Sequence, residues 1–462
     1  MQTECIPEQF EFEGVEGRSV VASFSGGRIT SNAGGLLLGQ LDRGIGLMRR
    51  FAACFTDRRD PRLVEHRVET LVGQRVFGLA LGYEDLIDHD ELRHDPTFAV
   101  LAGKLAPRLR PDCQAIAGKS TLNRLEHTPR RAAGKYHKID YDLARIEALF
   151  VDLFVAAHER SPQEIVLDLD ATDLPLHGRQ EGRFFHGYYD SYCYLPLYVF
   201  CGRHLLLARL RPSNIDASAG AVEAIAGIVG QIRRCWPKLG IVLRADSGFA
   251  REGLMAWCEA QRVDYVFGLA RNQRLETVLA EPLAEAARRC AETGQPARQF
   301  ADFTYRTLDS WSRARRVVGK AEHTLQGSNP RFVVTSLPKA THPAPSLYEA
   351  LYCARGEAEN RIGEQLELFA DRVSSATLQA NQLRLCFSAM AYILLDTLRR
   401  VGLGGTRLAD AAAATIRLKL LRLGAQIRIS IRRIYFAIAS GCPNQIEFAA
   451  AYGNLQRAFA PP

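Results

Sequence analysis

The order of strand-like and helix-like segments between residues 164 and 268 restricts the fold more than any other feature of the sequence. Three β-prone segments come first, and two amphipathic helical segments follow, each leading into one more apolar strand. The strands are expected at residues 164–170, 188–200, 204–210, 241–243 and 263–268. The predicted order is therefore β-β-β-α-β-α-β, with the first three strands antiparallel.

That order is typical of a ribonuclease-H-like α/β domain. The flanking segments have different patterns: the N-terminal one is mainly helical, and helices are expected again at residues 346–371 and 383–398. Near the C-terminus, alternating apolar residues predict a β-hairpin over 415–438 around Gly424. We predict an N-terminal domain (1–150), a core in two parts (161–270 and 341–400) interrupted by a β-rich insertion (271–340), and a basic tail (401–462).

Carboxylates stand at the ends of two predicted strands. Asp168 and Asp170 end the first strand on the same face, with Asp173 just beyond, and Asp246 ends the fourth strand before a Ser-Gly turn. An unpartnered carboxylate is costly to bury, so an apolar strand needs a reason to carry one. These residues are explained either by metal binding or by capping of turns and of a helix near Arg251.

A third candidate carboxylate lies on the helix expected at 346–371. Tyr352, Arg355 and Glu359 are spaced i, i+3 and i+7 and share one stripe, which Ile362 and Leu366 continue. Glu359 therefore either forms an internal salt bridge with Arg355 or faces a cation. Three carboxylates from separate elements are a sufficient ligand set for two Mg²⁺ ions that promote phosphoryl transfer.

The sequence resembles a known family in five stretches. It is similar to bacterial insertion-sequence transposases with a DDE triad, on the branch marked by Tyr-x2-Arg-x3-Glu, and most similar to the group catalogued as insertion sequence thirteen-eighty. The matching stretches are residues 167–173, 177–182, 192–197, 244–249 and 352–361. Weaker similarity extends from Ile29 to about Pro443.

The resemblance implies roles for individual residues. Asp170, Asp246 and Glu359 would be the catalytic, metal-binding triad for two Mg²⁺ ions, with Mn²⁺ as a substitute and Asp168 as the fallback for the first position. Tyr352 and Arg355 would approach the scissile DNA end, with Arg355 as a phosphate clamp. The family usually has a basic residue seven positions after the Glu. Here Leu366 occupies that position, so the nearby Arg361 is the candidate for a phosphate contact in this region.

Further DNA contacts are expected from three other residues. Trp311, which lies in an arginine-rich part of the insertion, either stacks on an unpaired base or packs in the core. Arg428 and Arg432 in the tail either track a DNA backbone or form a solvated face. The basic stretch between Lys104 and Lys138 has the same two explanations.

Composition limits the class of protein. The 59 Lys and Arg residues exceed the 51 Asp and Glu residues, giving a net charge of +8, which favours polyanionic partners. The 11 cysteines have no close metal-binding spacing, and neither a signal peptide nor an apolar segment of membrane-spanning length is evident. We expect a cytoplasmic protein with reduced thiols, associated with the nucleoid when it is bound to DNA.

Together these features predict a DNA transposase. It would bind the terminal inverted repeats of its element, cleave them, and join the 3′ ends to target DNA, as a homodimer in the DNA complex because two ends need two active sites. Two alternatives remain: a metal-dependent, structure-selective nuclease without strand transfer, and an inactive copy that binds DNA as a repressor.

Overall fold

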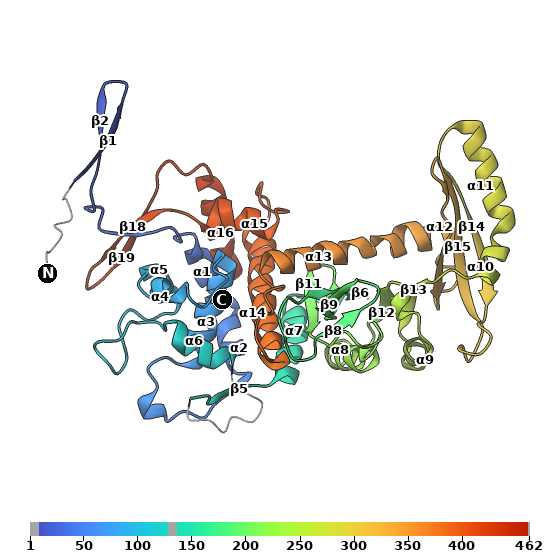
Figure 1. Cartoon of the computed structure of the whole chain (residues 1–462), viewed down its shortest axis with the longest axis horizontal. Helices are drawn as coiled ribbons and strands as arrows, with labels where there is room; N and C mark the ends of the chain where they lie inside the picture. Colours follow the sequence, from blue (N-terminus) through green and yellow to red (C-terminus); the bar gives the residue numbers. More distant parts are fainter. Residues whose placement is uncertain (1–8, 128–135, 461–462) are drawn as a thin grey trace. The chain divides into compact units, whose positions relative to one another are not determined.

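The computed structural model of the chain describes residues 9–127 and 136–460 and contains two compact units. Figure 1 labels the helices and strands. The first unit draws its described residues from Met1–Ala52, Asp57–Leu125 and Leu394–Pro462, and the second from Ala53–Thr56 and Glu126–Ile393. This division differs from the predicted one, because residues after 394 fold with the N-terminal segments and do not form a separate tail.

The first unit is mainly helical and carries two small antiparallel sheets, β1-β2 and β19-β18-β3. Its strands are β1 (Phe10–Val15), β2 (Arg18–Ala22), β3 (Arg28–Thr30), β18 (Ala425–Ile429) and β19 (Ile434–Ile438). Its helices are α1 (Gly35–Ile45), α2 (Leu47–Ala52), η1 (Pro61–Leu63), α3 (Val68–Leu81), α4 (His89–Leu92), α5 (Pro96–Leu101), α6 (Lys119–Glu126), η5 (Leu398–Gly402), α15 (Ala413–Ile416), η6 (Arg417–Leu421) and α16 (Gln445–Ala458).

The predicted hairpin over 415–438 is only half correct. Residues 413–421 are helical, and the hairpin is formed by β18 and β19 around a turn at 430–433. Ala413, Ile416 and Leu420 are buried, which is a helical spacing, whereas Leu418 is exposed. A short apolar run satisfies both periodicities, and packing decides between them.

The second unit is built on one nine-stranded mixed sheet. Along its main path the strands lie in the order β11-β10-β6-β12-β13-β17-β15-β14, with β16 paired to β15. These strands are β6 (Glu164–Ala171), β10 (Leu197–Cys201), β11 (His204–Arg209), β12 (Gly240–Ala245), β13 (Asp264–Leu269), β14 (Ala297–Tyr305), β15 (Arg315–Thr324), β16 (Gly327–Ser328) and β17 (Arg331–Thr335). The segment predicted as an insertion therefore adds its strands to this sheet through the pairing of β17 with β13.

Smaller strand pairs and the helices complete the unit. The strands are β4 (Phe55–Asp57) paired with β5 (Ile139–Tyr141), and the three-stranded sheet β7-β9-β8 formed by β7 (Leu174–Pro175), β8 (Phe184–His186) and β9 (Ser191–Tyr194). The helices are α7 (Leu143–Ala156), α8 (Ala221–Cys235), η2 (Ser247–Phe249), α9 (Glu252–Gln261), α10 (Gln273–Val278), α11 (Ala280–Thr293), α12 (Ala344–Ser346), η3 (Leu347–Tyr352), η4 (Cys353–Arg355), α13 (Gly356–Glu367) and α14 (Leu378–Thr397), which runs into the first unit.

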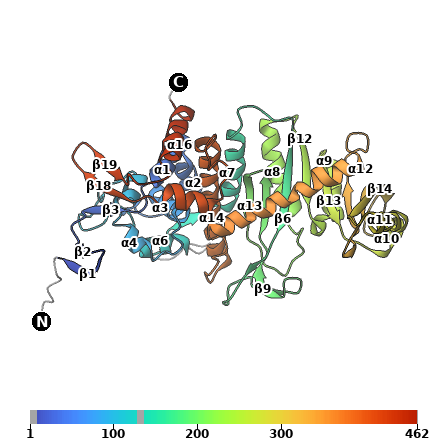
Figure 2. The same ribbon diagram turned by 90° about the horizontal axis from the view of Figure 1, so that it is seen from above.

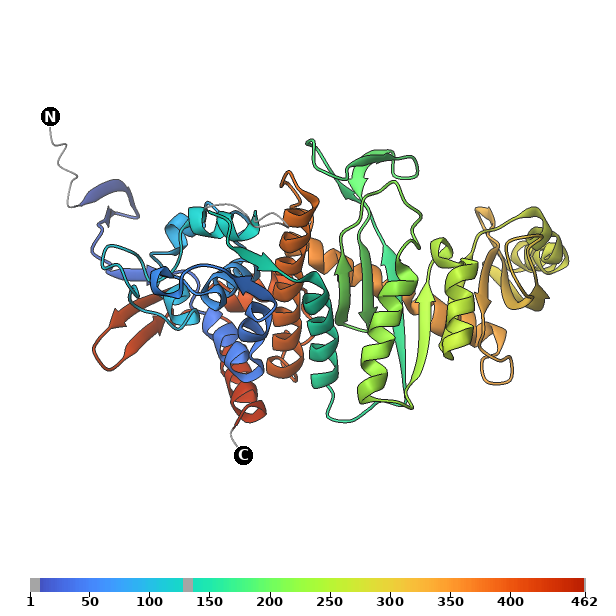
Figure 3. The same ribbon diagram turned by 90° about the horizontal axis from the view of Figure 1, so that it is seen from below.

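Helices cover both faces of the large sheet. Residues of α7, α8 and α9 pack with alternate strand residues such as Leu167, Leu169 and Leu243 on one face. The other face packs against η3, where Leu347 and Tyr348 meet Val242 and Val266. Figures 2 and 3 show α13 and the α8–α9 pair on opposite sides of the strands. Because strand side chains alternate, each strand contributes to both layers.

The helical region after the sheet is not one regular α-helix. It passes through a π-helical segment (η3) and a short 3-10 turn (η4) before α13, which ends at Glu367. Such π segments are frequent at functional sites. The helical phase between Tyr352, Arg355 and Glu359 is set by this irregular stretch.

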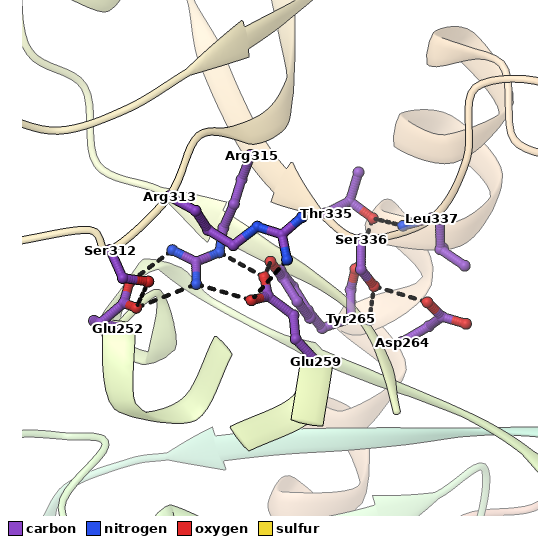
Figure 4. A network of polar contacts seen from close by, with 10 residues as sticks. All are labelled: Glu252, Glu259, Asp264, Tyr265, Ser312, Arg313, Arg315, Thr335, Ser336 and Leu337. Atoms are coloured by element: carbon purple, nitrogen blue, oxygen red, sulfur yellow. Dashed lines mark hydrogen bonds and ion pairs between the residues drawn. The ribbon is translucent and has the colours of Figure 1, made fainter. Parts of the chain in front are cut away.

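A network of ion pairs joins α9 to the start of β15 (Figure 4). The buried Arg315 guanidinium lies between two carboxylates: its Nε is 2.7 Å from Glu259 Oε1, and an Nη is 2.6 Å from Glu252 Oε2. Tyr265 of β13 donates a hydrogen bond to the same Glu259 carboxylate at 2.9 Å. The Arg315 side chain thus links β15, in the later part of the sheet, to α9 and through Glu259 to β13.

We expect Arg315→Met to destabilise the second unit by about 2–4 kcal/mol, because it leaves two partly buried carboxylates without their counter-ion. Arg289→Met is the matched control, since Arg289 pairs with Glu285 on the exposed surface of α11 and its loss should cost under about 0.5 kcal/mol. The three tryptophans, Trp236, Trp257 and Trp311, all lie in the second unit, so urea unfolding followed by tryptophan fluorescence measures it. Equal midpoints for the two variants would contradict this role.

Three further observations concern membrane-spanning helices, the cysteines and the basic stretch. Within residues 9–127 and 136–460, no helix is long and apolar enough to cross a membrane. The cysteines described in the structure are free thiols. Part of the basic stretch that ends at Lys138, residues 128–135, lies outside the described residues.

Candidate active site

The parallel pairing of β6 with β12 places the first carboxylates. Asp168 lies opposite Arg244, and Leu169 lies opposite Ala245. Asp168 accepts two hydrogen bonds from the Arg244 guanidinium, at 2.5 and 2.8 Å, and both side chains are buried. Both Asp168 oxygens are therefore engaged by an internal cation, which explains this residue as a structural ion pair.

Asp170 and Asp246 come next toward the carboxyl ends of these two strands. Asp170 is 9% exposed on β6, and Asp246 follows the last residue of β12. The Asp246 carboxylate accepts a hydrogen bond from the backbone N–H of Gly248 at 2.9 Å. The predicted capping role is thus present, but at the short turn η2 and not at the helix near Arg251.

The helical stripe supplies a third carboxylate and a cation. Arg355 lies between two carboxylates, with Nη1 at 3.5 Å from Asp170 Oδ2 and Nη2 at 2.6 Å from Glu359 Oε1. The predicted internal salt bridge between Arg355 and Glu359 is therefore observed. The same guanidinium reaches the end of β6, so it links the helix to the sheet.

All three carboxylates line one cavity of about 840 Å³. Arg355 lines the same cavity, together with Ile362, Gly363 and Leu366 on the continuing stripe of α13. The remaining lining residues are Ala171, Thr172, His186, Tyr188, Tyr189, Leu195, Ile215, Asp216, Ala217, Ser247 and Gly248. Residues from β6, the β12 turn and α13 thus converge on one space.

The electrostatics of this cavity favour a cation. Burial raises the pKa of Asp170 to about 6; the charge of Arg355 opposes this shift, and the negative charges of Asp246 and Glu359 reinforce it. One Arg faces three carboxylates, so the group carries excess negative charge. A divalent cation would relieve that repulsion.

The donor set fits a hard divalent metal in chemistry, because carboxylate oxygens are the ligands that Mg²⁺ prefers. In the described part of the chain, however, no three His, Cys, Asp or Glu side chains lie close enough together to hold an ion. The Arg355 guanidinium occupies the position of a counter-ion between Asp170 and Glu359. Binding of a metal by the triad would require these side chains to draw together.

Tyr352 does not line the cavity, but it packs directly beneath it, against Gly268 and the turn at Ser247, which we call the floor of the cavity. A Cβ atom on Gly268 of β13 would lie 2.5 Å from the Tyr352 hydroxyl oxygen and 2.9 Å from the Ser247 backbone nitrogen. Glycine at 268 thus permits β13, Tyr352 and the turn after Asp246 to approach closely. The sequence contained no signal for this dependence.

The structure separates other predicted residues from this site. Arg361 is paired with Glu364 at 3.6 Å, and it does not line the cavity with Arg355 and Glu359. Trp311 is 4% exposed and packs edge-on against Tyr305, which is the core role offered as its alternative. Its burial leaves no open ring face for a base.

The two tail arginines are in the first unit. Arg428 is exposed on β18, and Arg432 is exposed in the turn that follows it. Asp173 lies between β6 and β7 and does not line the cavity. Arg428 and Arg432 remain candidates for DNA contact.

Sequence reasoning missed several residues that line the cavity. His186 ends β8, and Tyr188 and Tyr189 lie in the turn before β9, where the sequence predicts a single strand over 188–200. The signal was present, since six of the eleven residues from 184 to 194 are Phe or Tyr. Asp216 was also missed; it lines the cavity and pairs with Arg251 at 2.9 Å.

The raised pKa of Asp170 predicts a pH-dependent stability. Because its folded-state pKa of about 6 lies above the ordinary value of 3.8, the folded chain loses stability as the pH rises through this range, by up to about 3 kcal/mol. Asp170→Asn removes this loss. We therefore expect the stability of Asp170→Asn relative to wild type to increase between pH 4.5 and 7.5, measured by urea unfolding in EDTA.

Asp216→Asn is a control for which the stability difference from wild type should change with pH in the opposite direction. Its bonds to Ser218 and Arg251 hold the pKa of Asp216 below the ordinary value, despite partial burial. The stability that Asp216 contributes is present at neutral pH and is lost as the pH falls. A relative stability of Asp170→Asn that is constant with pH would contradict the assigned environment.

Comparisons with known proteins identify the family of the chain. A family model described as Transposase DDE domain group 1 matches residues 12–460. No curated protein matches the chain. Among solved structures, the chain is similar to the piggyBac transposase in its synaptic complex with hairpin DNA, at 11% sequence identity and a TM-score of 0.42, over 92% of this chain and 82% of that one. The match of the family model over nearly the whole sequence shows that the chain belongs to the DDE-domain transposases of group 1.

Proposed function

We propose that the chain is a DNA transposase that binds the terminal inverted repeats of an insertion sequence, cleaves them, and joins the 3′ ends to target DNA. The observation that carries this proposal is the convergence of Asp170, Asp246 and Glu359 on one cavity from three separate elements. The strand order β11-β10-β6-β12-β13 supports a ribonuclease-H-like core, because it matches the β-β-β-α-β-α-β connectivity expected for that fold.

In this proposal the three carboxylates hold two Mg²⁺ ions. When bound, the ions would activate the attacking oxygen and stabilise the leaving oxygen of an in-line phosphoryl transfer. Asp170 and Asp246 come from adjacent strand ends, and Glu359 comes from α13 on the same face of the sheet. The buried Arg244–Asp168 pair anchors the strand that carries Asp170.

Arg355 has the geometry of a phosphate ligand. Its planar donor fork already contacts two carboxylates at the cavity, and the 3.5 Å separation from Asp170 is longer than a strong charge-assisted hydrogen bond. A DNA phosphate in the cavity would offer better acceptors. We propose that Arg355 exchanges carboxylate contacts for phosphate contacts when DNA binds, while Tyr352 supports the floor against Gly268.

Two cleaved ends require two active sites, so we propose a homodimer in the DNA complex. Arg428 and Arg432, on the exposed hairpin of the first unit, are proposed to contact the DNA backbone. We propose a cytoplasmic location, with association to the nucleoid through DNA.

The central test is metal-dependent cleavage of labelled DNA that carries the inverted repeats flanking the gene. We expect Glu359→Gln to reduce cleavage in Mg²⁺ by more than about 100-fold, because even outer-sphere partners of a metal cost 10- to 100-fold when removed. DNA binding, measured by gel shift, should be retained. Glu367→Gln, at the end of the same helix and outside the cavity, is the matched control and should cleave like wild type.

The outcomes separate the alternatives. Equal cleavage by Glu359→Gln and wild type would remove Glu359 from the active site. Cleavage by wild type without joining to a target plasmid would indicate a nuclease. Tight repeat binding without cleavage by wild type would indicate a repressor.

A second prediction concerns the floor of the cavity. Gly268→Ala places a methyl group against the Tyr352 hydroxyl and the Ser247 backbone, so the turn that holds Asp246 must shift. We expect cleavage to fall by at least about tenfold with DNA binding retained, since misplacement of a reacting group by 1 Å can cost about 100-fold. Adding Tyr352→Phe removes the closest contact and should restore part of the activity.

Gly253→Ala on α9 is the control for this prediction. Its Cβ would meet nothing within 4 Å, so cleavage should be unchanged. If Gly268→Ala cleaves DNA as fast as wild type, the close approach of Tyr352 and Ser247 to residue 268 is not needed for activity.

A further inference from the structure

An aromatic hairpin projects from the second unit between β6 and β10. We define it as residues 184–194, which comprise β8, the turn 187–190 and β9. Figures 2 and 3 both show it extending beyond the large sheet, to which it is connected through β10. In the β8–β9 ladder Phe185 lies opposite Tyr192, so these two rings share one face.

The hairpin exposes much of its aromatic surface. Tyr188 is 86% exposed, Phe185 53%, Tyr192 46% and Phe184 42%. Some rings pack against each other edge-on: Phe185 and Tyr192 have centroids 5.5 Å apart, and Tyr188 and Tyr189 have centroids 5.0 Å apart. Edge-on packing holds the rings in place, and their exposed fractions show that Tyr188 and Phe185 keep open ring surface. Contiguous exposed apolar surface, unlike singly scattered residues, marks interaction sites.

A cation accompanies the rings. The Arg183 guanidinium carbon lies 3.9 Å from the centroid of the Tyr192 ring, and Arg183 also donates a hydrogen bond to the Gly178 carbonyl. Open aromatic faces next to an arginine are the combination with which proteins hold single-stranded nucleic acid, because every base has a face that can stack and every phosphate is negative.

The hairpin is continuous with the carboxylate cavity. His186, Tyr188 and Tyr189 line the same cavity as Asp170 and Asp246. The Tyr189 hydroxyl donates to the carbonyl of Ala171, the residue after Asp170, at 3.3 Å. The turn of the hairpin, which carries the exposed Tyr188, thus lies beside the carboxylates.

We propose that the aromatic hairpin binds an unpaired nucleobase of the DNA strand whose phosphate enters the carboxylate cavity. The base would stack on Tyr188 or Phe185, with Arg183, which lies over the Tyr192 ring, near its phosphate. Bases inside a duplex already stack on their neighbours, so open aromatic faces select a base that has left the helix or lies in a single-stranded end. This inference rests on the proposed function, since it requires DNA at the cavity.

The test uses two short DNA probes of the same duplex sequence. One is blunt, and the other carries a five-nucleotide single-stranded tail with one 2-aminopurine, whose fluorescence is quenched when it stacks on an aromatic ring. Binding is measured in EDTA with the full chain, so no cleavage is needed. We expect wild type to prefer the tailed probe and to quench its fluorescence.

The variants probe the stacking surface. Tyr188→Ala combined with Phe185→Ala should weaken binding of the tailed probe by about tenfold or more and abolish quenching, since stacking on one aromatic ring is worth about 1–3 kcal/mol. Binding of the blunt probe should not change. Tyr188→Phe keeps a ring and should behave like wild type. Tyr452→Ala on α16, which removes a tyrosine that is 52% exposed, is the matched control.

Several results would overturn the proposal. Unchanged quenching in the double variant, or equal loss of blunt and tailed binding, would exclude base stacking on this hairpin. A shift of the oligomer size in sedimentation by the double variant, with unchanged DNA binding, would instead identify the hairpin as a contact between copies. Stacking is measured in EDTA without cleavage and cleavage is measured separately in Mg²⁺, so failure of the triad in cleavage and failure of the hairpin in stacking are read separately.

Discussion

The parallel pairing of β6 with β12 is the constraint on which the site depends. Its register sets Asp168 against Arg244 and, two residues later, brings Asp170 and Asp246 to the same edge of the sheet. Leu167 and Leu169 point to the opposite face and form the core with α7, α8 and α9. A slip of one residue would exchange the two sets and put carboxylates into an apolar layer, so the core itself enforces the site geometry.

Two arginines divide the carboxylates into different roles. Arg244 is buried and holds Asp168 through two short hydrogen bonds, which leaves that aspartate neutralised. Arg355 is shared between Asp170 and Glu359, and its contact with Asp170, at 3.5 Å, is longer than its contact with Glu359, at 2.6 Å. The two aspartates are two residues apart on one strand and burial raises the pKa of both, yet only Asp170 lies on the cavity wall. This difference supports the choice of Asp170 over Asp168 for the proposed triad.

The strand order and the candidate carboxylates could be predicted because they depend on local patterns. Apolar runs separated by turns predict strands, and carboxylates at strand ends attract attention because burial penalises them. Local patterns failed where two periodicities coincide, as at Ile416 and Leu420, which are helical. Local patterns also predicted one strand where the structure has β9 and β10. The strand is interrupted at Leu195 and Pro196, because a proline has no N–H to donate to a strand ladder.

The sequence by itself determined the α/β class, the order of the core strands, and the identity of Asp170, Asp246, Arg355 and Glu359 as the residues to examine. Only the tertiary structure decided that Arg244 takes Asp168, that Gly268 makes room for Tyr352, that strands after 271 extend the same sheet, and that residues after 394 fold with the N-terminal unit. The physical reason is distance along the chain. Periodicity and turn chemistry act over a few residues, whereas these contacts join segments from about 60 to several hundred residues apart, and packing alone selects them.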